Sequence, residues 1–69
     1  MTTDTPLRLL RLPDVEGRVG LRRSMIHRLE QRGEFPRRVR ISARAAGWIE
    51  SEINDYIHAR IAASRITAA

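Results

Sequence analysis

Gly20 separates two short stretches of sequence that each have the spacing of an amphipathic helix. In the first stretch, residues 12–19, three apolar side chains recur at three- and four-residue intervals: Leu12, Val15 and Val19. A glycine directly after such a stretch favours a left-handed residue that ends the helix. The first structured segment is therefore predicted to be a helix of about two turns, followed by a tight turn.

The second stretch runs from about residue 22 to residue 32 and stops at Gly33. Ile26 and Leu29 form its apolar side, and Leu21 in the turn is expected to fill the gap between the two helices. Two helices joined by a short, glycine-containing turn are typical of a helix-turn-helix. We therefore expect residues 22–32 to form the recognition helix of such a motif.

Residues 37–41 alternate between two kinds of side chain. Val39 and Ile41 alternate with Arg38 and Arg40, which is the pattern of a strand with one buried face. We expect the two apolar side chains to be buried and the two arginines to point outward.

Residues 42–44 form a plausible turn, and residues 45–48 are expected to return as a second strand. Their small side chains, and Gly47 in particular, permit a close approach of another backbone. Trp48 then closes the hairpin and, with Phe35, is expected to pack in the core rather than stack on bases. Residues 37–48 are thus predicted to form a wing.

The last apolar pattern is the longest, with members at three- and four-residue spacing: Ile49, Ile53, Tyr56, Ile57 and Ile61. It predicts a helix of about three turns that supplies the largest apolar share of the core. The predicted fold class is mainly α with a small β-hairpin, a winged helix-turn-helix of three helices and a two-stranded wing over residues 8–62. Residues 1–7 are expected to be a disordered tail and residues 63–69 a frayed one.

The chain has 69 residues and no cysteine, which limits it to one small domain without disulfides or a thiolate zinc site. Such a domain leaves little room for preorganised catalytic groups. Glu50 and Glu52, two residues apart on a helix, do not face each other. The sequence also lacks a membrane-spanning run and a signal-peptide pattern. We expect a bacterial cytoplasmic, nucleoid-associated binding protein that is not an enzyme and holds no cofactor or metal.

The positive charge is concentrated in one part of the sequence. All 13 basic residues are arginine, and the formal net charge is +5. Residues 8–44 hold 11 arginines and 4 acids, whereas residues 45–69 hold 2 arginines and 3 acids. A concentrated basic surface attracts phosphate, and the arginine fork also fits a guanine edge. Because a helix fits the major groove, the predicted partner is double-stranded DNA.

The candidate DNA-binding residues lie on the second helix and the wing: Arg22, Arg23, Ser24, His27, Arg28, Arg38, Arg40 and Arg44. Each has an alternative role. Ser24 could cap its own helix, and Arg28 could pair with Glu30 or Glu34. The wing arginines could serve only to keep an edge strand from aggregating.

The chain resembles the AlpA-type prophage regulators. The resemblance covers about residues 8–62 and lies in Arg11–Val15, Gly20–Leu29, Gly33–Arg37, Val39, Gly47–Trp48 and Ser51–Ile53. It implies a MerR-like, excisionase-like winged helix with no catalytic activity or cofactor. It also implies a role in transcription of integrase genes or in excision, as a recombination directionality factor. The same eight residues fall at the family's recognition-helix and wing positions.

Three positions depart from the family pattern. Members commonly have Ser or Thr where Arg22 stands, Thr where Met25 stands and Tyr where His27 stands. The first change removes a helix N-cap, which costs about 1 kcal/mol, but adds a cation near the groove. His27 lies on the face expected to contact bases, so the family's base preference is not carried over to this chain.

One domain of this size buries only about 600–1,000 Å² on DNA. Tight binding is therefore expected to need cooperative self-association, or a partner such as the integrase or RNA polymerase; no membrane partner is expected. Two alternatives remain open. One is a small basic RNA-binding protein, and the other is a protein-interaction anti-repressor that docks through its last helix.

Overall fold

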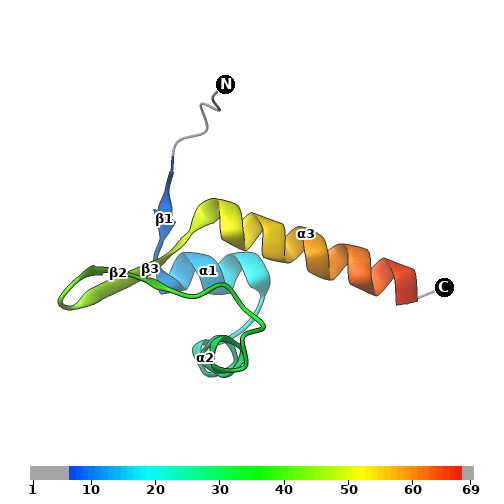
Figure 1. Cartoon of the computed structure of the whole chain (residues 1–69), viewed down its shortest axis with the longest axis horizontal. Coiled ribbons are helices and arrows are strands. Elements are labelled where there is room, and N and C mark those ends of the chain that lie inside the picture. The colour runs from blue at the N-terminus through cyan, green and yellow to red at the C-terminus, as the bar shows by residue number, and fades with distance from the viewer. Residues whose placement is uncertain (1–6, 68–69) are drawn as a thin grey trace.

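The computed structural model describes residues 7–67, which form three helices and a small antiparallel sheet (Figure 1). The elements follow the order β1 (Leu9–Leu10), α1 (Leu12–Val19), α2 (Arg23–Gln31), β2 (Val39–Ser42), β3 (Ala45–Ile49) and α3 (Glu50–Thr67). The predicted mainly helical architecture with a hairpin wing is confirmed. In Figure 1, α1 lies between α2 and α3, and the β2–β3 hairpin and α3 project from opposite ends of the molecule.

The two glycines expected to end helices both adopt left-handed backbone conformations. Gly20 has φ +74°, and its N–H donates a 2.9 Å hydrogen bond to the Glu16 carbonyl. Gly33 has φ +75° and follows the last turn of α2. Residues with a Cβ rarely adopt this conformation, so these glycines set the ends of the two short helices.

The core is built from six buried apolar side chains that come from nearly every part of the fold: Leu10, Val15, Ile26, Phe35, Trp48 and Ile53. The predicted packing roles of Phe35 and Trp48 are confirmed. The Phe35 ring also meets Tyr56 edge to face, with the ring centroids 4.7 Å apart. Leu21 is partly buried against this core, as expected of a residue between two helices.

The last helix supplies as much of the core as α1 does, and not clearly more: Ile53, Tyr56 and Ile57 come from α3, and Leu12, Val15 and Val19 come from α1. Ile53 is its only fully buried apolar residue within the described part of the chain, and Ile61 remains 41% exposed. Helix α3 extends away from the rest of the molecule, and its later turns lie beyond the other helices and strands that the structure describes (Figure 1).

The sheet contains one strand more than predicted, in the order β1-β3-β2. Strand β1 places Leu9 opposite Ile49 and Leu10 opposite Trp48. A Cβ added at Gly47 would lie 2.8 Å from the Leu10 carbonyl oxygen. The expected close backbone approach at Gly47 therefore exists, and the backbone that approaches it is β1.

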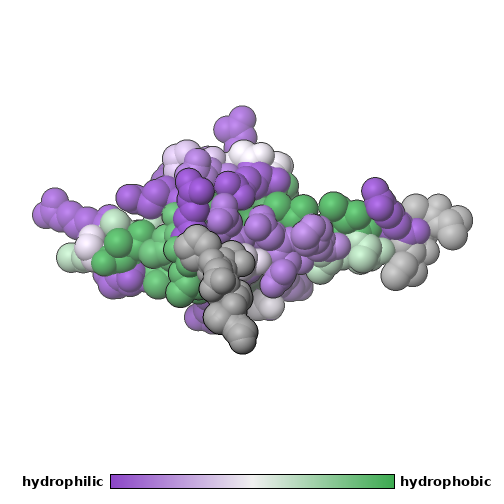
Figure 2. All heavy atoms as spheres, turned by 90° about the horizontal axis from the view of Figure 1, so that it is seen from above, coloured by the Kyte–Doolittle hydropathy of each residue, from purple (hydrophilic) through white to green (hydrophobic). Residues whose placement is uncertain are grey.

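The predicted burial of one face of the alternating strand is wrong, because all four residues of β2 are exposed. Val39 and Ile41 are 36% and 44% exposed, not buried. Arg40 pairs across the ladder with Ala46, which lies two residues from Trp48 and hence on the same face of the sheet. The arginines thus share the face that carries the buried tryptophan. Seen from the side of α3, the hairpin shows hydrophobic surface (Figure 2).

The ends of the chain differ in part from the prediction. Helix α3 continues to Thr67, so residues 63–67 are helical where a frayed tail was expected. The remaining tail predictions, for residues 1–6 and 68–69, lie outside the described residues. No helix within residues 7–67 is both long enough and apolar enough to cross a bilayer.

Candidate nucleic-acid interface

Arg22, Arg23 and Ser24 lie together at the amino-terminal end of α2, and all three are exposed. Arg22 occupies the N-cap position with φ −90° and ψ 165°, but its side chain caps nothing. Ser24 does not cap the helix either, because its hydroxyl has no hydrogen-bond partner among the described residues. The first turn of α2 therefore presents free backbone N–H groups and two cations to the solvent.

His27 and Arg28 follow one turn later and are also exposed. His27 Nε2 lies 3.4 Å from the side-chain nitrogen of Gln31. The alternative ion pair of Arg28 with Glu30 or Glu34 does not form. Arg28, like the two arginines of the first turn, therefore has no carboxylate partner among the residues that the structure describes.

The wing arginines surround one hollow. Arg38, Arg40 and Arg44 line it together with three alanines, whose small side chains leave the space open: Ala43, Ala45 and Ala46. Arg40 Nη1 donates a 3.3 Å hydrogen bond to the Ala43 carbonyl, which holds its guanidinium near the turn. Arg40 and Arg44 form no ion pair with any described carboxylate. The hollow therefore carries two arginines without a carboxylate partner, a charge that favours a phosphate group.

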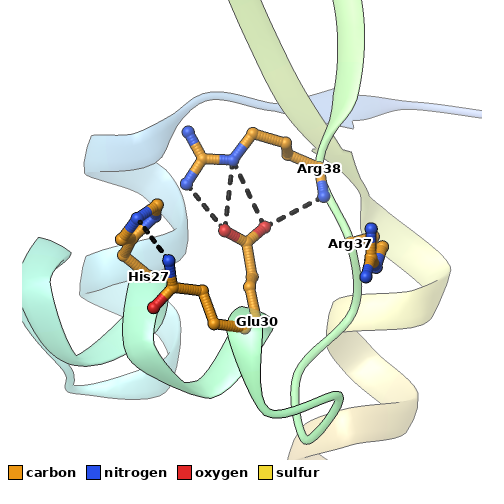
Figure 3. Close-up of a pocket in the computed structure, with 5 residues that line it drawn as sticks. His27, Glu30, Arg37 and Arg38 are labelled. Carbon is orange, nitrogen blue, oxygen red and sulfur yellow. Dashed lines mark hydrogen bonds and ion pairs between the residues drawn. The ribbon is translucent and has the colours of Figure 1, made fainter.

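Arg38 differs from the other two because its guanidinium is bound to Glu30 (Figure 3). The carboxylate of Glu30 accepts hydrogen bonds from Arg38 Nε at 3.1 Å, from Arg38 Nη2 at 2.7 Å and from the Arg38 backbone N–H at 3.0 Å. These side-chain hydrogen bonds raise the pKa of Arg38 above its ordinary value, so the guanidinium stays charged.

Trp48 completes this cluster. Its indole Nε1 donates to Glu30 Oε2 at 3.1 Å and to the Pro36 carbonyl at 3.1 Å. The Arg38 guanidinium carbon lies 5.1 Å from the centroid of the Trp48 ring. Glu30, only 8% exposed, is thereby fully hydrogen-bonded, as a buried carboxylate must be.

Glu30 was not among the residues that the sequence singled out for a site. The sequence suggests it only as a partner of Arg28. A signal was present, because Glu30 comes four residues after Ile26 and so lies on the buried side of the helix. A carboxylate on a buried helix face requires a donor, and the indole N–H of a core tryptophan is one.

One ion pair lies outside the basic surfaces among the described residues. Arg18 on α1 forms an ion pair with Glu50 at the start of α3, at 3.2 Å. No group of three or more metal-ligating side chains occurs among residues 7–67.

Residues 8–61 match the model of the family described as "Prophage CP4-57 regulatory protein (AlpA)". The chain is also 40% identical, over 58 residues, to "Uncharacterized protein ORF88" of Enterobacteria phage P4. That match covers 84% of this chain but 66% of the phage protein, so the chain spans just under two thirds of that relative's length. The resemblance inferred from the sequence is confirmed: the chain belongs to the AlpA family of prophage regulatory proteins.

Proposed function

We propose that this protein binds specific sequences in double-stranded DNA and regulates a prophage or genomic island. Its action would be on transcription or, as a recombination directionality factor, on excision. Both would take place at the bacterial nucleoid. The observation that carries the proposal is the placement of two groups of arginines that have no carboxylate partner among residues 7–67. One group lies on α2 (Arg22, Arg23 and Arg28) and the other on the wing (Arg40 and Arg44).

These two groups lie on the same side of the sheet. Arg40 shares the sheet face of Trp48, and the Trp48 indole reaches Glu30 on α2. A duplex that received α2 would therefore find the wing arginines beside it. In a winged helix-turn-helix, the recognition helix enters the major groove with its amino-terminal residues nearest the base edges.

The roles of individual residues follow from this placement. Arg22, Arg23, Ser24 and His27 are proposed to contact base edges or adjacent phosphates, because they occupy the first turns of α2. Two cations at a helix amino terminus oppose the helix dipole, and phosphate oxygens would offset that repulsion. Phosphate contacts are proposed for three arginines further from the helix start: Arg28, Arg40 and Arg44. Such contacts hold the protein in register while the base contacts carry the sequence information.

The test is a fluorescence-anisotropy titration with two duplexes of equal length. One comes from the region around the protein's own gene and a neighbouring integrase gene, and the other is a scrambled version. Specific recognition requires at least about tenfold tighter binding to the first, equivalent to about 1.4 kcal/mol. Equal, weak binding to both would contradict the proposal, and tighter binding to structured RNA at equal salt would replace it with RNA binding.

Salt dependence tests the arginine surface separately. If the five arginines named above neutralise phosphates, the logarithm of the binding constant should fall with the logarithm of salt concentration at a slope of about −4.5. A slope shallower than about −2 would contradict the arginine contacts. Footprinting then distinguishes a promoter from an attachment site. Sedimentation on DNA shows whether copies associate, and pull-downs with integrase and RNA polymerase test the proposed partners.

A further inference from the structure

We propose that Glu30 and Arg38 form a brace that holds the wing in a set position relative to α2, and that Arg38 is a positioning residue rather than a phosphate ligand. The proposal rests on the DNA-binding function proposed above. It separates Arg38 from the two other arginines that line the same hollow, Arg40 and Arg44.

The wing needs such a connection because α2 has few other ties to the sheet. The most extensive backbone neighbourhoods between elements join the strands to one another, α1 and α3 to β3, and α1 to α3, and none of these involves α2. Ile26 and Leu29 attach α2 to the core, but these apolar contacts have no preferred direction. Hydrogen bonds have a preferred direction, so those that Glu30 accepts from Arg38 and Trp48 can set the angle between α2 and the wing.

The brace acts on the residue directly before β2. The backbone N–H of Arg38 donates to Glu30, and β2 begins at Val39. Trp48, in the neighbouring strand β3, donates to the same carboxylate. One side chain of α2 therefore holds both strands of the hairpin. A displacement of the wing would break several charge-assisted hydrogen bonds at once.

The same contacts occupy the parts of Arg38 that a phosphate would need. Its Nε and Nη2 form a forked interaction with the carboxylate, and its guanidinium lies over the Trp48 ring. A DNA phosphate would have to displace Glu30, leaving a carboxylate only 8% exposed without its cation. Since the pair is neutral as a unit, it adds nothing to counterion release when DNA binds.

Glu30→Gln gives a test in which the two models predict opposite signs. Removing a negative charge next to DNA strengthens binding if Arg38 is thereby freed for a phosphate. If the brace sets the wing, Glu30→Gln weakens specific binding by about tenfold or more, and the salt slope stays at the wild-type value. Equal or tighter binding by Glu30→Gln would overturn the proposal.

Lysine substitutions provide the matched control. Lysine can contact a phosphate but cannot form the forked pair with a carboxylate. Arg44→Lys should therefore bind DNA nearly as well as the wild type, and Arg44→Ala should flatten the salt slope by about 0.9. Arg38→Lys should bind about as weakly as Arg38→Gln, with the wild-type slope in both. If Arg38→Lys binds DNA with wild-type affinity, the brace is overturned. This variant tests the brace on its own if Glu30→Gln does not fold.

A measurement without DNA keeps this inference distinct from the proposed function. The Arg38 amide hydrogen should exchange slowly in the wild type and at least about tenfold faster in Glu30→Gln, relative to amides in α1. If the wild type does not bind the specific duplex, the proposed function fails. The exchange rate of the Arg38 amide then remains as the test of its contact with Glu30. Equal exchange in both proteins would then overturn the brace. Specific wild-type binding that Glu30→Gln strengthens would refute the brace alone.

Discussion

Replacing Arg22 with serine should make the protein more stable and a weaker DNA binder. Arg22 already has the extended backbone conformation of an N-cap residue, with φ −90° and ψ 165°, but no side chain accepts the free N–H groups of the first turn. A serine hydroxyl there could accept a hydrogen bond from the N–H of Ser24 or Met25, which contributes about 1 kcal/mol. Removing a cation from the positive end of the helix dipole adds about 0.3 kcal/mol or more at an exposed site.

The expected total is about 1.3 kcal/mol, which for a domain of this size raises Tm by about 5–10 °C. Thermal unfolding followed by circular dichroism measures this directly. Arg22→Ala is the matched control, because it removes the charge without supplying a cap. In anisotropy titrations, both variants should flatten the salt slope by about 0.9.

Two separate results would refute this reasoning. If Arg22→Ser is no more stable than Arg22→Ala, the N-cap position is not available for capping. If the salt slope of both variants equals that of the wild type, Arg22 makes no phosphate contact. In proteins of the AlpA family that this chain resembles, serine or threonine is common at this position. This chain therefore has a cation where those proteins have a capping hydroxyl.

Two further predictions concern stability and are measured by urea unfolding. Gly47→Ala should destabilise the protein by about 1–3 kcal/mol, because the new Cβ would lie 2.8 Å from the Leu10 carbonyl oxygen, a backbone atom. Gly17→Ala, in an open helical position, should instead stabilise it by about 0.5–1 kcal/mol, and equal effects would disprove the close approach. Ile53→Ala, at a residue with 0% exposure, should cost about 2–5 kcal/mol. Val39→Thr should change stability by less than about 0.5 kcal/mol, and a loss like that of Ile53→Ala would show that Val39 is buried after all.

The basic surface was largely predictable because its signal is local. The concentration of arginine before residue 45 is visible in the sequence, and the spacing along α2 indicates which residues lie away from Ile26. The structure adds that Arg28 has no acidic partner among residues 7–67. The tie between Glu30 and Arg38 was not predictable in this way, since it depends on how α2 approaches the start of β2.

The sequence alone determined where the two short helices, α1 and α2, end. Gly20 and Gly33 adopt left-handed conformations because glycine has no Cβ, a property that does not depend on distant residues. The spacing of apolar residues along a helix likewise identifies one continuous face without knowledge of the rest of the fold. Only the tertiary structure decided which side of the wing faces α2. An alternating strand has two faces, and the one that packs inward depends on distant partners. Here Trp48 sets that face, because Leu10 lies opposite it in β1 and its indole donates to Glu30 on α2. Val39 is therefore exposed, and Arg38 lies over the Trp48 ring and binds α2 through Glu30.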